Sequence, residues 1–235
     1  MKLSGAFVSE RKSVYCASVW VFFLSVLFFI FWAVSIVAVQ LRANDHLIQK
    51  KSTDGDNGIF AFFIFTYIFM SIFFYYVLTF LIATACGTWY YGEDDNYCLT
   101  GVGRINKYHI GSFTFAALVL TFVKILQIIV NSSGEKSDNV VARCVQCFIS
   151  CILRTIEHIL RALNNVSVIV MAVTGESYCD SAKNAAFVLL DNLPLYSVVS
   201  LMSNFIVFGG VLFSVSLPTV IGMLYCSKNM NPTDK

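Results

Sequence analysis

The sequence predicts an all-α fold, a polytopic helical membrane bundle of about five membrane segments plus an amphipathic interfacial helix. Two stretches of 36 residues, Asn57–Gly92 and Asn192–Ser227, contain no Asp, Glu, Lys or Arg, and Ser13–Leu41 adds 29 more. About 20 apolar residues are enough to cross a bilayer core roughly 30 Å thick. The chain is 13% charged, whereas globular domains carry about 25% charged residues. A β-barrel would instead show weak alternation over about 10 residues at a time.

We expect residues 1–235 to form a single transmembrane domain. The fourth segment is the least clear, because its uncharged run, Ala162–Gly175, is only 14 residues long. This segment either tilts in and crosses the membrane or is re-entrant, and we favour crossing. The expected spans are approximately 15–41, 59–86, 109–131, 152–174 and 197–226.

An amphipathic helix is predicted at 140–163, ahead of and overlapping the fourth segment. Its apolar and polar residues each recur at steps of three or four, and Arg143, Arg154 and Arg161 fall on the polar face. A basic amphipathic helix of this kind is typical of the headgroup layer. An amino terminus outside the cell places nine basic residues of the loops and helix ends inside and six outside, a weak preference for that orientation.

Three cysteines crowd one stretch of this helix, at Cys144, Cys147 and Cys151. On a helix the first and last lie about 10 Å apart along the axis, too far for both to bind one zinc ion, so no metal site is expected. S-acylation beside the membrane is one reading of the cluster, and small apolar side chains buried in a helix interface are the other.

Few charges fall inside the expected spans. Lys124 lies within the third span, and an intramembrane charge is a functional hypothesis by default. The alternative is that its long side chain reaches the inner membrane surface. Glu157 is spaced for helical ion pairs with Arg154 and Arg161, which favours a structural role for it.

Aromatic residues make up 15% of the chain, and Trp89, Tyr90 and Tyr91 follow one another at the end of the second span. Such a cluster is typical of the aromatic belt at a membrane surface. It also suits a cage for a quaternary ammonium group, held by cation–π attraction beside the acidic loop Glu93–Asp95. Composition alone favours the belt.

No enzymatic motif appears, so no catalytic residue and no cofactor are predicted. The chain lacks a glycine-rich phosphate loop, a His-Glu-x-x-His motif and a serine nucleophile elbow. Its net charge of +2 gives no indication of nucleic-acid binding. The protein is therefore expected not to be an enzyme.

Three stretches occur in an order that resembles a known membrane family. Residues 85–91 read Ala-Cys-Gly-Thr-Trp-Tyr-Tyr, and residues 108–115 read Tyr-His-Ile-Gly-Ser-Phe-Thr-Phe. The third stretch begins with Leu-Asn-Asn-Val-Ser-Val-Ile at 163–169 and continues to Tyr-Cys-Asp-Ser-Ala-Lys-Asn-Ala at 178–185. Together they look like the carboxy-terminal half of the choline transporter-like family.

This resemblance implies a multi-pass plasma-membrane transporter of choline, or of a related amine such as ethanolamine, that works largely without sodium coupling. It moves the balance toward a cage, so the substrate-binding candidates are Trp89, Tyr90, Tyr91 and Lys124. Family members are longer, and we expect a truncated member here. The alternative function is therefore a truncated, non-transporting membrane subunit or scaffold. The expected partners are an organic cation such as choline, the lipid bilayer, and a second copy or a partner membrane subunit.

Overall fold

The computed structural model is built of helices throughout the residues that it describes, which are Phe7 and residues 13–48, 54–91, 102–103, 105–134 and 140–229. The chain divides into two units, Met1–Ala186 and Phe187–Lys235, and each is described by itself. The helices are α2 (Ser13–Ile48), α3 (Asp54–Tyr91), the π-helical turn η1 (Ile105–His109), α5 (Ile110–Gly134), α6 (Val140–Thr174), α7 (Tyr178–Asp191) and α8 (Leu193–Asn229).

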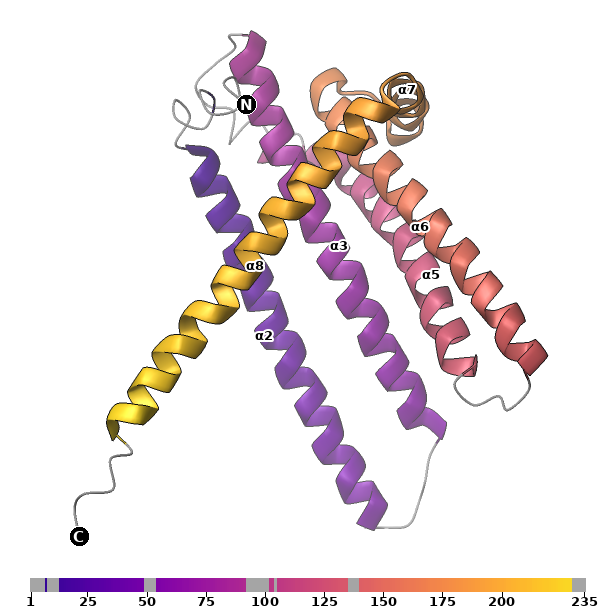
Figure 1. The fold of residues 1–235 in the computed structure, drawn as a ribbon, viewed down its shortest axis with the longest axis vertical. Coiled ribbons are helices and arrows are strands. Elements are labelled where there is room, and N and C mark those ends of the chain that lie inside the picture. The colour runs from indigo at the N-terminus through magenta and orange to yellow at the C-terminus, as the bar shows by residue number, and fades with distance from the viewer. Residues whose placement is uncertain are drawn as a thin grey trace. The chain divides into compact units, whose positions relative to one another are not determined.

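Five of these helices are long and apolar enough to cross a membrane. In the first unit α2, α3, α5 and α6 run alternately up and down, as short connections between long helices require (Figure 1). Each helix satisfies its backbone internally, which is what a lipid environment demands. The predicted all-α, multi-span fold is confirmed. The candidate spans are Ser18–Arg42, Gly58–Tyr91, Lys107–Ser132, Arg143–Thr174 and Leu193–Tyr225.

The core of the first unit lies where α3, α5 and α6 meet. Tyr76 and Phe80 of α3, Phe113 of α5 and Met171 of α6 are fully buried there. The rings of Phe80 and Phe113 meet edge to face with centroids 5.2 Å apart, a geometry that aromatic pairs prefer. This packing fixes the ends of α3 and α6 beside the start of α5, where the candidate site lies.

Helix α2 packs against α3 through aromatic side chains. Trp32 Nε1 donates a hydrogen bond to the carbonyl oxygen of Phe63 at 3.1 Å. The rings of Phe28 and Phe74 lie 5.9 Å apart in a T-shaped contact. Most of the remaining described surface of α2 is exposed, which suits a helix facing lipid.

Helix α6 is continuous, so the amphipathic segment 140–163 runs into the span 152–174 without a break. Arg143, Arg154 and Arg161 are exposed, while two other polar residues of its first half contact α5. Gln146 Nε2 donates to the carbonyl oxygen of Val130 at 2.9 Å, and Ser150 Oγ donates to Asn131 Oδ1 at 2.9 Å. Polar residues that join two membrane helices give the same sequence periodicity as a helix lying on the surface.

We predict that α6 crosses the membrane alongside α5, so that Arg154 lies deeper than Arg143. Eleven residues of helix separate them by about 16 Å along the axis. In a background lacking native cysteines, Arg143→Cys should react readily with a membrane-impermeant thiol reagent, and Arg154→Cys much more slowly. Equal labelling of the two positions would instead favour a helix lying flat in the headgroup layer.

The first unit ends in a tight turn and the short helix α7. Gly175 has φ +74°, and its N–H donates to the carbonyl oxygen of Met171 at 2.9 Å, which closes the end of α6. Any side chain at Gly175 would adopt this left-handed conformation at a cost. In α7 Ser181 and Ala185 are buried. The second unit is mainly α8, an uncharged helix through Ser227 with Pro218 in its interior.

Candidate functional site

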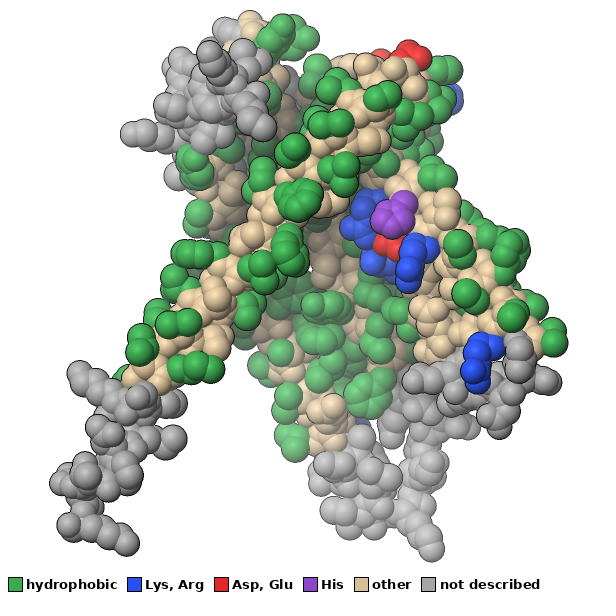
Figure 2. Space-filling model, in the orientation of Figure 1, with side chains coloured by type: hydrophobic (Ala, Val, Ile, Leu, Met, Phe, Trp, Pro, Cys, Tyr) green, Lys and Arg blue, Asp and Glu red, His purple; other side chains and the backbone are tan. Residues whose placement is uncertain are grey.

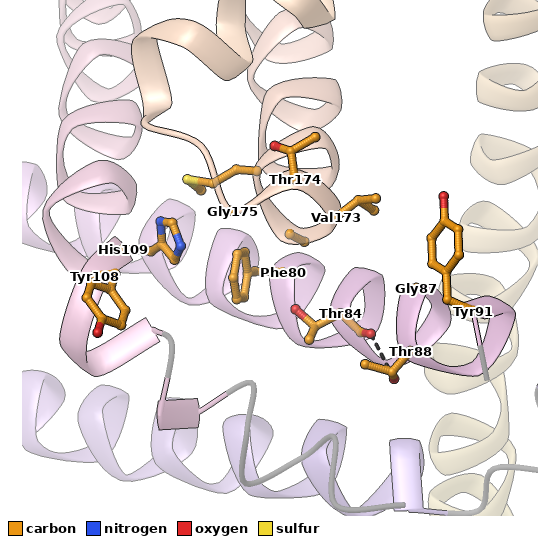
Figure 3. A pocket seen from close by; sticks show the side chains of 12 residues that line it. Phe80, Thr84, Gly87, Thr88, Tyr91, Tyr108, His109, Val173, Thr174 and Gly175 are labelled. Atoms are coloured by element: carbon orange, nitrogen blue, oxygen red, sulfur yellow. Dashed lines mark hydrogen bonds between the residues drawn. The ribbon is translucent and has the colours of Figure 1, made fainter. Parts of the chain in front are cut away.

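A cavity of about 500 Å³ opens where α3 and α6 end and η1 leads into α5. Four aromatic side chains line it: Phe80 and Tyr91 from α3, and Tyr108 and His109 from η1 (Figure 3). The last turn of α6 and Gly175 supply the remaining wall. The described lining residues include no Asp, Glu, Lys or Arg. We call this cavity the aromatic pocket.

The aromatic pocket has a buried floor and an exposed mouth. Phe80, Thr84 and His109 form the floor, and none of them exceeds 6% exposure. The Phe80 and His109 rings lie 5.3 Å apart. Tyr91 and Tyr108 are two-thirds exposed and lie at opposite sides of the pocket in Figure 3. A ligand entering between the tyrosines would leave water and meet rings on several sides.

Helix ends give the aromatic pocket a partial negative charge. The last turns of both α3 and α6 line it, and the carboxyl end of a helix carries about half a negative elementary charge. The turn η1 precedes the amino end of α5, which contributes the opposite sign. The amino ends of α5 and α7, at Ile110 and Tyr178, are not among the described lining residues, so the helix ends that line the pocket are both negative. The acidic loop Glu93–Asp95, expected to add full charges here, lies outside the described residues.

One cation already lies at the mouth of the aromatic pocket. The Lys107 ammonium nitrogen is 5.2 Å from the centroid of the Tyr108 ring, within the range of cation–π attraction. This contact shows that the Tyr108 ring is placed to hold a positive charge. It also means that a cationic ligand would compete with Lys107 at this ring.

A second cavity of about 500 Å³, almost wholly apolar, adjoins the first. It is lined by Ile82, Trp89 and Tyr90 among others, and shares Tyr91, Gly87 and Val173 with the aromatic pocket. The Trp89 ring meets that of Phe7 at 5.5 Å. We call this cavity the apolar groove. Of the residues expected to bind substrate, Trp89 and Tyr90 thus line only the groove, while Tyr91 lines both cavities.

Lys124, the fourth expected site residue, is not among the residues lining either cavity. Its Nζ lies 3.1 Å from Glu157 Oε1, and the same oxygen accepts a 2.6 Å hydrogen bond from Arg161. The cluster joins α5 to α6 and forms a small charged area on a largely apolar face (Figure 2). Glu157 is the only acidic residue within the five candidate spans. We therefore interpret Lys124 as part of an ion-pair cluster that links α5 to α6.

A buried polar network lies beneath the aromatic pocket. The Tyr178 hydroxyl donates to Asn164 Oδ1 at 2.5 Å, and Asn164 Nδ2 donates to the Tyr76 hydroxyl at 3.2 Å and the Ala116 carbonyl oxygen at 3.4 Å. Asn164 is 1% exposed, and its bonds tie together α3, α5, α6 and α7. Burial raises the pKa of Tyr178 to about 12, so its hydroxyl stays protonated and remains a donor.

The cysteine cluster faces outward. Cys144, Cys147 and Cys151 are free thiols with exposed side chains on α6. Their exposure is what an S-acylation reaction would need, and it does not match small side chains packed in a helix interface. S-acylation of these cysteines stays a proposal.

Sequence reasoning did not single out Phe80, Thr84 or His109 as site residues. Phe80 is one of 22 phenylalanines, and nothing in the sequence marks it apart from the others. His109 lies within residues 108–115, one of the stretches that resemble the family, and it is the only His near the start of an expected span. Both facts could have marked it as a site residue. Thr84 was the polar residue closest to the end of an apolar run.

The fold and the site define a multi-pass helical membrane protein with an aromatic-lined pocket at one end of its helices. The chain belongs to the plasma-membrane choline transporter family, whose sequence model matches residues 1–234. This is a family of membrane transporters and not of enzymes, and it places the chain in the plasma membrane as a multi-pass protein.

Named relatives agree with this assignment. Choline transporter-like protein 4 of Rattus norvegicus is 35% identical over 127 residues, covering 53% of this chain and 18% of that protein. Choline transporter-like protein 2 of Xenopus laevis is 29% identical over 134 residues, covering 56% and 19%. Choline transporter-like protein 1 of Torpedo marmorata is 27% identical over 227 residues, covering 88% and 34%. The chain thus spans between about a fifth and a third of the length of these relatives.

Proposed function

We propose that this protein binds choline or a closely related organic cation in the aromatic pocket and takes part in moving it across the plasma membrane. The observation that carries the proposal is the pocket itself. It combines four aromatic rings with the carboxyl ends of two helices, and no Lys or Arg is among its described lining residues. Both features favour a positive charge.

The size and depth of the aromatic pocket support this function. Its volume of about 500 Å³ falls within the range of about 300–1,000 Å³ that is common for small-molecule sites. Its floor is buried, with the Phe80 ring packed on Phe113 and His109. The cation–π attraction is about 2 kcal/mol when the cation is desolvated, compared with about 0.5–1 kcal/mol at a site exposed to water.

The pocket lies at one end of the candidate spans, since Gly58–Tyr91 ends at Tyr91 and Lys107–Ser132 begins beside Tyr108. With the amino terminus outside the cell, this end faces outward and would receive substrate from outside. Transport would then need the pocket to open toward the other end, through movement of α3 and α6 against their neighbours.

We predict that Tyr91→Leu weakens choline binding by about 2- to 5-fold, because Leu keeps the bulk of the side chain but removes a ring at the partly exposed mouth. Tyr91→Phe keeps the ring and should bind as the wild type does. The measurement is choline binding to purified protein in nanodiscs, with uptake into proteoliposomes as the second readout. Equal affinities for Tyr91→Leu and wild type would remove Tyr91 from the site.

Trp89→Leu, measured in the same assays, tests whether the cation contacts the apolar groove as well as the aromatic pocket. No change in choline affinity would confine the cation to the pocket. A loss similar to that of Tyr91→Leu would extend the cage to Trp89 and the groove. Choline binding without any uptake by the wild-type chain would favour a non-transporting subunit that needs a partner.

A further inference from the structure

Thr84 has a buried hydroxyl that no other residue described by the structure satisfies. Its side chain is 2% exposed, and Oγ1 has no hydrogen-bond partner among the described residues. Thr84 also lies in the floor of the aromatic pocket, between Phe80 and Thr88 (Figure 3). A buried polar atom left unpaired costs about 1–3 kcal/mol, so a native structure needs a reason to keep one.

Other threonines show that this hydroxyl had an easy alternative. A helical threonine normally donates to the carbonyl oxygen four residues earlier. Each of the other described threonines does so, at distances of 2.7–3.1 Å. They are Thr66, Thr79, Thr88, Thr114, Thr121, Thr155, Thr174 and Thr219.

The neighbouring hydroxyl in the pocket makes the contrast sharper. Thr88 lies one helical turn after Thr84 and lines the same cavity, yet its Oγ1 lies 3.1 Å from the carbonyl oxygens of both Thr84 and Ala85. The Thr88 hydroxyl is therefore occupied by the backbone. Thr84 therefore contributes a buried hydroxyl whose hydrogen-bonding capacity no described residue uses.

We infer that Thr84 Oγ1 hydrogen-bonds a hydroxyl group of the bound cation and so selects hydroxylated ammonium compounds over their deoxy analogues. This inference rests on the proposed function, because it concerns the same pocket. The attraction of the rings and helix ends for the positive charge does not by itself distinguish an ethyl from a hydroxyethyl substituent. Thr84 can, since its hydroxyl both donates and accepts.

A matched pair of ligands isolates this contact. Choline and ethyltrimethylammonium carry the same quaternary charge and differ by one hydroxyl. An apolar wall discriminates poorly between such isosteres, whereas a buried polar group that would be left unpaired discriminates strongly. The wild-type protein should therefore bind choline about 5- to 10-fold more tightly than ethyltrimethylammonium.

The test measures the affinities of both ligands for purified wild type, Thr84→Val, Thr84→Ser and Thr114→Val in nanodiscs. Thr84→Val replaces the hydroxyl by a methyl group and should remove the preference, lowering choline affinity about 5- to 10-fold with ethyltrimethylammonium within 2-fold of wild type. Thr84→Ser should keep the preference. Thr114→Val is the control, because Thr114 bonds Ile110 at 2.9 Å and lines neither cavity.

Thermal stability gives an independent readout. Because the Thr84 hydroxyl is unpaired in the empty pocket, Thr84→Val should unfold at the same temperature as wild type or a higher one. An unchanged ratio of the two affinities in Thr84→Val would overturn the role of Thr84 while leaving the pocket as a cation site. Failure of wild type to bind either ligand would overturn the proposed function and this inference with it.

Discussion

Glu157→Gln is expected to lower the free energy of unfolding by about 2–3 kcal/mol. Glu157 Oε1 is shared by Lys124 and Arg161, at 3.1 and 2.6 Å. Neutralising it leaves two cations at a depth where lipid replaces water, and the candidate spans hold no other acidic residue. The effect stays below that of a fully buried pair because the Lys124 and Arg161 side chains are 33% and 47% exposed and can move toward the membrane surface.

The double variant Lys124→Met/Glu157→Gln separates the ion pair from general damage. If the two residues act through each other, the double variant should be clearly more stable than the sum of the two single effects predicts. Chemical unfolding in detergent, followed by circular dichroism, measures each free energy. Strict additivity of the single effects would mean that Lys124 and Glu157 do not depend on each other.

The same variants decide what Lys124 does. As a tie between α5 and α6, Lys124→Met should lower stability and leave choline affinity unchanged. A loss of choline affinity in folded Lys124→Met would instead mean that this lysine takes part in substrate binding, as its position within a span first indicated.

The fold could be predicted from the sequence because lipid imposes a simple rule on the backbone. A charge-free run of 29 or 36 residues has few structures open to it other than a membrane helix. The course of α6 could not be predicted in the same way. Gln146 and Ser150 read equally well as groups facing headgroups and as groups bonding α5, and only the packing distinguishes the two.

The site was predictable only in part for a similar reason. Tyr91 was expected because adjacent aromatic residues stand out at the end of a span. Phe80 and His109 become neighbours only when α3 meets α5, a contact between residues far apart in the sequence. Thr84 depends on a single rotamer, since another choice would bond its hydroxyl to the preceding turn as in every other described threonine.

The largest effect beneath the pocket is expected from Asn164→Leu, which should lower the free energy of unfolding by about 2–4 kcal/mol. The substitution leaves the hydroxyls of the buried Tyr76 and the half-buried Tyr178 without their partner, and Asn164 itself is 1% exposed. Hydrogen bonds between membrane helices average only about 0.6 kcal/mol each, so most of the loss comes from the two stranded hydroxyls.

This reasoning predicts that removing more polar groups restores stability. The triple variant Tyr76→Phe/Asn164→Leu/Tyr178→Phe has no stranded hydroxyl and keeps nearly the same shape, so it should be more stable than Asn164→Leu alone. Unfolding of the single and triple variants under one set of conditions gives the comparison. A triple variant less stable than Asn164→Leu would show that the two rings themselves need their hydroxyls, and that the network does more than satisfy Asn164.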